Sequence, residues 1–276
     1  MARIWAMRQP ILVLVGMYML TFTLSAAFAA PSAELVEVAP TAFSATKPLL
    51  GYLTRPHGKG PFAAVVVLHG CAGFGPRETA WAQQLVSWGY VALAIDSFTP
   101  RNIITCNGLA GGGSVDAILA LQYLTHLPFV AAGQVAVLGS SLGGTEALGD
   151  VEKNTYEHIY HVKFKAAIAY YPSCTGDSGM VQVPTLVMIG ESDDWAWAQS
   201  CREMLARAVK QGAPLKLIVY PNATHDFNVP AAAPYLIDGH HLSYDPEATQ
   251  DAVKQVRDFF RDQLAYHDNE QGDAER

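Results

Sequence analysis

The sequence predicts a three-layered α/β fold with a mostly parallel sheet, and three observations support this. The chain has 276 residues, half of them hydrophobic and only 16% charged, which excludes collagen-like, low-complexity and disordered classes. Apolar runs of strand length alternate with segments of helical period, which indicates right-handed crossovers between parallel strands. The runs are continuous and rich in β-branched residues, as is typical of strands buried on both faces.

Residues 1–29 have the features of a secretory signal peptide. Arg3 and Arg8 form a basic start, an apolar run extends from Ile11 to Leu24, and Ala27-Phe28-Ala29 is a small-x-small cleavage pattern. We expect cleavage after Ala29 and an exported product, periplasmic or secreted, with no stable membrane anchor. The alternative, a transmembrane anchor, is disfavoured because the uninterrupted run is shorter than a span of ~20 residues and no basic flank follows it.

Residues 30–276 are expected to form a single α/β domain, because no repeat, linker tract or charge block marks a boundary. The formal net charge of −7 becomes more negative once the two arginines of the leader are removed. Such a surface does not suit a polyphosphate partner, so nucleic-acid binding is not expected. The sequence carries no indication of the oligomeric state.

The first half of the domain begins with two weaker extended stretches, followed by a strong strand. Phe62–Leu68 (FAAVVVL) is a continuous apolar run that ends at His69-Gly70. The later segments of this half alternate between apolar runs of strand length and segments with helical spacing. The predicted elements are strands at 34–38, 49–53, 62–68, 90–95 and 135–138, and helices at 78–88 and 114–126.

The second half repeats this alternation. Strands are predicted at 166–170, 184–189 and 215–220, and helices at 195–210 and 248–264. In parallel sheets of this kind, chemistry gathers where the strands end at their carboxyl edge. Three of these ends carry a serine, an aspartate and a histidine.

Ser141 is the candidate nucleophile. Gly139-Ser140-Ser141-Leu142-Gly143 follows one predicted strand and precedes a helix, which matches the GxSxG nucleophile elbow in pattern and in context. The glycines accommodate the sharp turn, which exposes Ser141 at the amino end of a helix. The alternative, an ordinary Gly-Ser turn, does not require this placement between strand and helix.

Asp193 and His225 are the candidate acid and base. Asp193 and Asp194 follow one late strand, and His225 follows the next. The chain order Ser, Asp, His is that of α/β-hydrolases. Spacing alone does not separate the two aspartates, and Asp194 is alternatively a cap for the helix that begins near Trp195.

The loop Leu68-His69-Gly70-Cys71-Ala72-Gly73 follows the first strong strand and is rich in glycine. We assign the oxyanion hole to the backbone N–H groups of Cys71 and Leu142. Cys71 as a rival nucleophile is disfavoured because the motif places no base beside it.

These residues together resemble the dienelactone hydrolase-like group of α/β-hydrolases from about residue 62 to 264. The motifs that carry the resemblance are HGCAG, GSSLGG, YYPSC, IGESDDW, YPNATHDF and YDPEA. The resemblance implies that Asp193, three residues after Gly190, is the acid, and that His225 is the histidine of the HxF motif. It implies no cofactor, and a small-molecule ester or lactone as the substrate.

The chain also departs from dienelactone hydrolases proper. Those enzymes have a cysteine nucleophile and a glutamate in the oxyanion-side loop, where this chain has Ser141 and Gly70. The departures argue against dienelactone itself as the substrate and leave an ester or lactone hydrolase mechanism in place. Five residues adjoin the catalytic loops and are candidates for substrate contact, with loop packing as the alternative: Phe74, Arg77, Tyr171, Trp195 and Trp197.

Four cysteines lie after the leader, and an even count in an oxidising compartment suggests two disulfides, with free thiols as the alternative. Their spacing fits no zinc motif. The strand order of α/β-hydrolases, which the resemblance implies, places two pairs of cysteines after adjacent strands. It thereby implies the bridges Cys71–Cys106 and Cys174–Cys201.

Other features leave alternatives open. A perhydrolase or acyltransferase uses the same triad with a different acceptor, and a non-catalytic binding protein of the same fold is the non-enzyme alternative. The sequence does not decide whether residues 226–247 form a lid. Four further histidines lack a third ligand and an indicated acidic partner, so we expect them to be solvated or hydrogen-bonded rather than metal-bound: His158, His161, His240 and His241.

Overall fold

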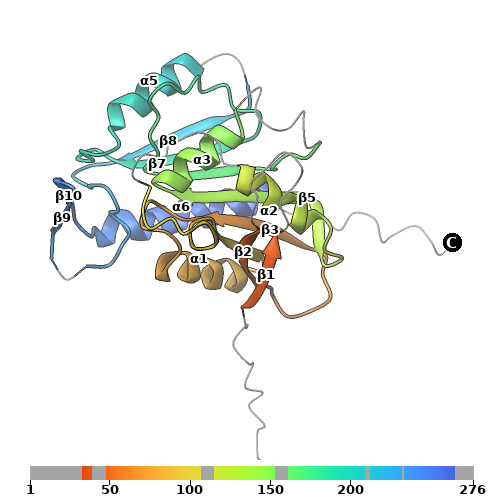
Figure 1. Cartoon of the computed structure of the whole chain (residues 1–276). Coiled ribbons are helices and arrows are strands. Elements are labelled where there is room, and N and C mark those ends of the chain that lie inside the picture. The colour runs from red at the N-terminus through yellow and green to blue at the C-terminus, as the bar shows by residue number, and fades with distance from the viewer. Residues whose placement is uncertain are drawn as a thin grey trace, which may run out of the picture. The chain divides into compact units, whose positions relative to one another are not determined.

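An eight-stranded, mostly parallel sheet organises the described part of the chain (Figure 1). The computed structural model describes residues 33–38, 48–106, 115–152, 161–208, 212–231 and 233–264, so the expected leader lies outside the described residues. The strands follow the order β1-β2-β4-β3-β5-β6-β7-β8. Their bounds are β1 Glu34–Val38, β2 Leu49–Thr54, β3 Phe62–Leu68, β4 Val91–Asp96, β5 Val130–Ser140, β6 Ala167–Tyr170, β7 Thr185–Gly190 and β8 Leu215–Tyr220.

The sheet is parallel from β4 to β8, whereas β2 pairs antiparallel with both β1 and β4. The central strand β3 explains the continuous apolar run, because Val65 and Val66 are fully buried between two neighbouring strands and two helical layers. The parallel alignment brings the carboxyl ends of β5, β7 and β8 to one edge of the sheet.

Helices cover both faces of this sheet, so the expected three-layered α/β fold is confirmed. In Figure 1, α3 lies in front of the sheet and α6 behind it. Helix α6 has a side-chain cap: the Asp245 side chain accepts from the amides of Glu247 and Ala248, and Pro246 is the first residue of the helix. The helices are α1 Pro76–Ser87, α2 Val115–Thr125, α3 Leu142–Asp150, α5 Ala198–Ala208 and α6 Pro246–Gln263, with a 3-10 turn η1 at Thr99–Arg101.

The sequence located the elements and missed some of their ends. Strand β5 begins at Val130, five residues before the predicted start, because Val130 pairs with Phe62 beyond an irregularity in the register. The residues between are partly exposed and so lack an apolar run. The segment 226–247 contains a hairpin of β9 Tyr235–Ile237 and β10 His240–Leu242, which the sequence analysis did not predict.

Both expected disulfides are present in the structure, Cys71–Cys106 and Cys174–Cys201, with Cα–Cα distances of 4.8 and 4.9 Å. The first joins the loops after β3 and β4, and the second joins the loop after β6 to α5, which follows β7. Each pair of strands is adjacent in the sheet, with β5 between the two pairs. The pairing implied by the family's strand order is therefore confirmed.

A cluster of charged groups lies between α2 and α3, and it predicts a stability that depends on pH. Arg101 binds Asp116 through two hydrogen bonds of 2.5 and 2.7 Å. Burial, assisted by the Asp116 charge and opposed by Arg101, raises the pKa of Glu146 to about 8. The folded protein therefore keeps a proton on Glu146 that the unfolded chain releases at lower pH. The stabilisation is complete below the ordinary pKa of a glutamate and is lost as the pH rises through about 8.

We expect Glu146→Gln to reduce the fall in melting temperature between pH 6 and pH 9, because the glutamine cannot lose a proton. Thermal unfolding followed by circular dichroism at both pH values measures this. Glu203→Gln, on the exposed face of α5, is the matched control and should melt like the wild type at each pH. The same pH dependence in wild type and Glu146→Gln would contradict the assignment.

Candidate active site

Ser141 lies at a strained turn between β5 and α3. Its backbone has φ 55° and ψ −115°, a region that residues other than glycine rarely adopt. A Cβ on Gly139 would lie 2.0 Å from the carbonyl oxygen of Gly143, and one on Gly143 would lie 2.6 Å from that of His69. The turn therefore requires glycine at both positions of the predicted elbow.

The three predicted catalytic side chains lie together in one hydrogen-bonded row. His225 Nε2 is 2.9 Å from Ser141 Oγ, and His225 Nδ1 is 2.8 Å from Asp193 Oδ2. Asp193 follows β7 and His225 follows β8, and both side chains are buried. With the Nδ1 proton donated to the carboxylate, Nε2 is free to accept the serine proton.

The structure also distinguishes the two adjacent aspartates. Asp193 Oδ1 accepts from the amides of Trp195 and Ala196 at 3.0 and 2.7 Å, so the same carboxylate holds its loop and faces His225. The alternative reading of Asp194 as a helix cap is wrong, because α5 begins only at Ala198. Asp194 instead accepts from the amide of His241 at 3.2 Å.

The glycine-rich loop after β3 lies directly against the elbow. A Cβ on Gly70 would be 3.5 Å from the Cβ of Ser141, which shows how closely the two loops approach. His69 holds this loop: its Nε2 accepts from the Ser97 amide at 3.2 Å, and its Nδ1 is 2.8 Å from the Gly70 carbonyl oxygen. Sequence reasoning did not give His69 a role, although it directly follows the strand. The loop that contains Cys71 is thus placed beside Ser141.

Two aromatic rings pack on the imidazole of His225. The ring centroids of Tyr171 and Trp195 are 4.7 and 5.2 Å from that of His225. Tyr171 is fully buried, and burial is the main cause that raises the pKa of its hydroxyl, so it stays protonated. These contacts limit the orientations that the imidazole can adopt.

The five candidates for substrate contact take different positions. Phe74 stacks on Tyr52 with a centroid distance of 4.3 Å, as the packing alternative expected. Trp197 is 68% exposed, whereas Trp195 is 38% exposed and its ring contacts those of His225 and His240. Tyr171 is enclosed and contacts His225 instead of solvent.

Arg77, the fifth candidate, is the centre of a polar network that sequence reasoning did not foresee. Its guanidinium donates to Asp226 Oδ1 at 2.6 Å, to the Tyr171 hydroxyl at 3.1 Å and to Glu78 Oε1 at 3.2 Å. Burial acts to lower the pKa of Arg77, but the interactions with Tyr171, Asp226 and Glu78 outweigh burial and raise this pKa above its ordinary value. The Tyr171 hydroxyl in turn donates to Asn228 Oδ1 at 2.7 Å. Arg77 is therefore charged and balanced by two carboxylates.

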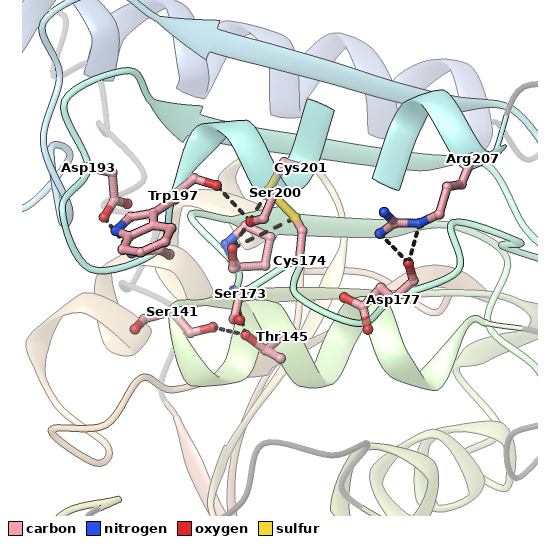
Figure 2. The surroundings of a disulfide bond; sticks show 12 residues. Ser141, Thr145, Ser173, Cys174, Asp177, Asp193, Trp197, Ser200, Cys201 and Arg207 are labelled. Atoms are coloured by element: carbon pink, nitrogen blue, oxygen red, sulfur yellow. Dashed lines mark hydrogen bonds between the residues drawn. A yellow bond between two sulfur atoms is a disulfide. The ribbon is translucent and has the colours of Figure 1, made fainter. Parts of the chain in front are cut away.

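The second disulfide, Cys174–Cys201, joins the loop that follows β6 to α5, and its surroundings include Ser141 and Asp193 (Figure 2). The Thr145 hydroxyl is bonded to the carbonyl oxygen of Ser141 at 3.1 Å and to the amide of Ser173 at 2.9 Å. Cys174, next in the chain, is bridged to Cys201 near the start of α5. A short covalent and hydrogen-bonded path thus connects the Ser141 turn to the helix that follows Asp193.

The β9–β10 hairpin packs against the loop that follows β7 and contains Asp194. His240 stacks on Trp195 at 4.6 Å, and the rings of His240 and His241 lie 3.3 and 3.1 Å from the Asp194 carboxylate. Asp194 is an acidic partner that the sequence did not indicate.

His158 lies outside the described residues. Among the residues that the structure describes, no three His, Cys, Asp or Glu side chains gather as a metal site requires, and no helix is long and apolar enough to cross a bilayer.

A mostly parallel sheet covered by helices, with a serine at a strand-to-helix elbow and a histidine after the last strand of the sheet, defines an α/β hydrolase. The sequence profile of the dienelactone hydrolase family matches residues 49–264. The chain belongs to this family and is a hydrolase.

The comparisons with individual proteins agree with this assignment. A probable 2-oxo-3-(5-oxofuran-2-ylidene)propanoate lactonase from Bradyrhizobium is 27% identical over 199 residues, which cover 65% of this chain and 79% of the relative. A putative dienelactone hydrolase from Klebsiella pneumoniae has the same fold, with a TM-score of 0.66, 18% identity, and coverage of 84% of this chain and 99% of that one.

Two further solved structures share the fold. A dienelactone hydrolase-like promiscuous phosphotriesterase from metagenomic libraries has a TM-score of 0.68 at 22% identity, and the alignment covers 86% of this chain and 100% of that one. A propionate-bound esterase from Thermogutta terrifontis has a TM-score of 0.64 at 17% identity, with 86% and 97% coverage. Both similarities establish the fold alone.

Proposed function

We propose that the protein hydrolyses carboxylic esters or lactones through a covalent acyl-enzyme on Ser141. The observation that carries this proposal is the row Asp193–His225–Ser141, with contacts of 2.8 and 2.9 Å. These distances lie within hydrogen-bond reach, as a nucleophile with its base and a third, orienting group requires.

The reaction proceeds in two halves. Ser141 Oγ attacks the carbonyl carbon while His225 Nε2 takes the hydroxyl proton, and Asp193 stabilises the imidazolium that forms. The amides of Cys71 and Leu142 stabilise the oxyanion, and the intermediate then expels the alcohol, which receives the proton from His225. A water molecule, deprotonated by His225, attacks the acyl-enzyme in the same way and releases the acid. These steps use only side chains, backbone amides and water.

The relatives support this reaction class. One curated relative carries the name of a lactonase, and one solved neighbour that of an esterase. Export of the protein is part of the proposal, and the two disulfides support it, since such bonds form and persist in oxidising compartments.

A panel of esters and lactones tests the proposal. We expect the protein without its leader to release acid from p-nitrophenyl esters or from simple lactones with saturation kinetics. Parallel assays with hydrogen peroxide or an alcohol as the acceptor measure perhydrolysis and acyl transfer. Hydrolysis that exceeds both transfer reactions supports the proposal, whereas no turnover of any ester or lactone, or transfer without hydrolysis, would overturn it.

A further inference from the structure

A cavity of about 470 Å³ opens between α1, α6 and the loop that follows His225. This volume lies within the range of small-molecule sites. Its walls are mainly apolar, with Ala80 and Trp81 from α1, Val229 and Pro230 from the loop, and Val253 from α6. No proposed catalytic residue lines it.

One end of this cavity lies beside the catalytic centre. Arg77 lines the cavity, and its Nη2 is 3.2 Å from the position that a Cβ on Gly70 would occupy. That same position is 3.5 Å from the Cβ of Ser141. Because Gly70 has no side chain, the Arg77 guanidinium can approach the serine elbow this closely.

A second set of contacts joins the cavity to the catalytic histidine. Asn228 also lines the cavity and accepts a hydrogen bond from Tyr171, whose ring packs on His225. The cavity wall therefore adjoins the surroundings of the nucleophile through Arg77 and those of the base through Asn228 and Tyr171.

We propose that this cavity is the subsite for an apolar chain of the ester substrate. The proposal rests on the ester or lactone hydrolysis proposed above and adds the class of substrate, a neutral ester with a medium-length alkyl chain. The wall from Pro76 to Gln84 spans eight helical rises of α1, about 12 Å, which accommodates such a chain.

The charges at the inner end favour a neutral chain over an anionic one. Arg77 is the cation of this end, and Asp226 and Glu78 already bind its guanidinium. A substrate carboxylate would have to compete with both of these acids for Arg77. An uncharged methylene chain instead gains from leaving water for the apolar walls.

Ala80→Trp fills the cavity from an exposed position of α1, and Gln83→Trp adds the same side chain at an exposed position that does not line it. We expect the wild-type kcat/KM for p-nitrophenyl esters to rise from acetate to octanoate, because each methylene that is fully buried contributes about a fourfold gain. Ala80→Trp should lower kcat/KM for octanoate about tenfold or more, mainly through KM, and change that for acetate less than twofold. Gln83→Trp should behave like the wild type.

A second series, alkyl acetates of increasing alcohol length, shows which side of the ester the cavity holds, since only the chain that enters it should be sensitive to Ala80→Trp.

A binding measurement keeps the test of the cavity separate from the test of catalysis. The apolar fluorophore 1-N-phenylnaphthylamine should bind Ser141→Ala and be displaced by decanol, and it should not bind Ser141→Ala/Ala80→Trp. Equal losses on acetate and octanoate, no sensitivity of either series, or unchanged fluorophore binding would overturn the subsite, whereas fluorophore binding without any ester turnover would overturn only the hydrolase proposal.

Discussion

Replacing Ser141 by alanine is expected to abolish ester hydrolysis, with a loss in kcat on the order of 10⁶ as in other serine hydrolases. The hydroxyl is the group that would form the covalent bond, and His225 Nε2 lies 2.9 Å from it to take its proton. A fluorophosphonate probe should label the wild type and leave Ser141→Ala unlabelled. Mass spectrometry of the intact protein and of its peptides measures both results.

Ser87→Ala is the control for this experiment. Ser87 is exposed at the end of α1, where its hydroxyl is bonded to the carbonyl oxygen of Gln84. The variant should be labelled like the wild type. Labelling that persists in Ser141→Ala, or that maps to another serine, would show that the nucleophile lies elsewhere.

Asp193→Asn is expected to lower kcat on the order of 10⁴, the scale known from triads in other enzymes. An asparagine keeps the size of the side chain but removes the charge that stabilises the imidazolium, and its amide nitrogen disfavours the tautomer with a proton on Nδ1. Steady-state kinetics with an ester that the wild type turns over measures the loss.

Asp194→Asn is the matched comparison, because it makes the same change one residue further along the same loop. Asp194 touches His240 and His241 but not His225, so a much smaller loss is expected. An equal loss in the two variants, or a greater one in Asp194→Asn, would contradict the assignment of the acid. Thermal unfolding of both variants shows whether any loss reflects misfolding, since Asp193 also binds the amides of Trp195 and Ala196.

The sequence by itself determined the alternation of strands and helices and the serine elbow. These features are encoded locally: a strand buried on both faces needs a continuous apolar run such as β3, and the turn at Ser141 admits only glycine at Gly139 and Gly143. The carboxyl ends of parallel strands meet at one edge, so the positions of Asp193 and His225 after strands could also be read from the sequence. The disulfide pairing required more, namely the strand order that the family resemblance supplied.

Only the tertiary structure decided which groups touch one another. Spacing cannot separate two adjacent aspartates, whereas the folded loop turns Asp193 toward His225 and Asp194 toward the β9–β10 hairpin. The bond from Arg77 to Asp226 joins residues 149 positions apart, and the cavity beside it is formed by α1, α6 and the loop that follows His225, which are far apart in the sequence. Such contacts depend on how the elements pack in three dimensions, and neither hydrophobic periodicity nor a local motif records that packing.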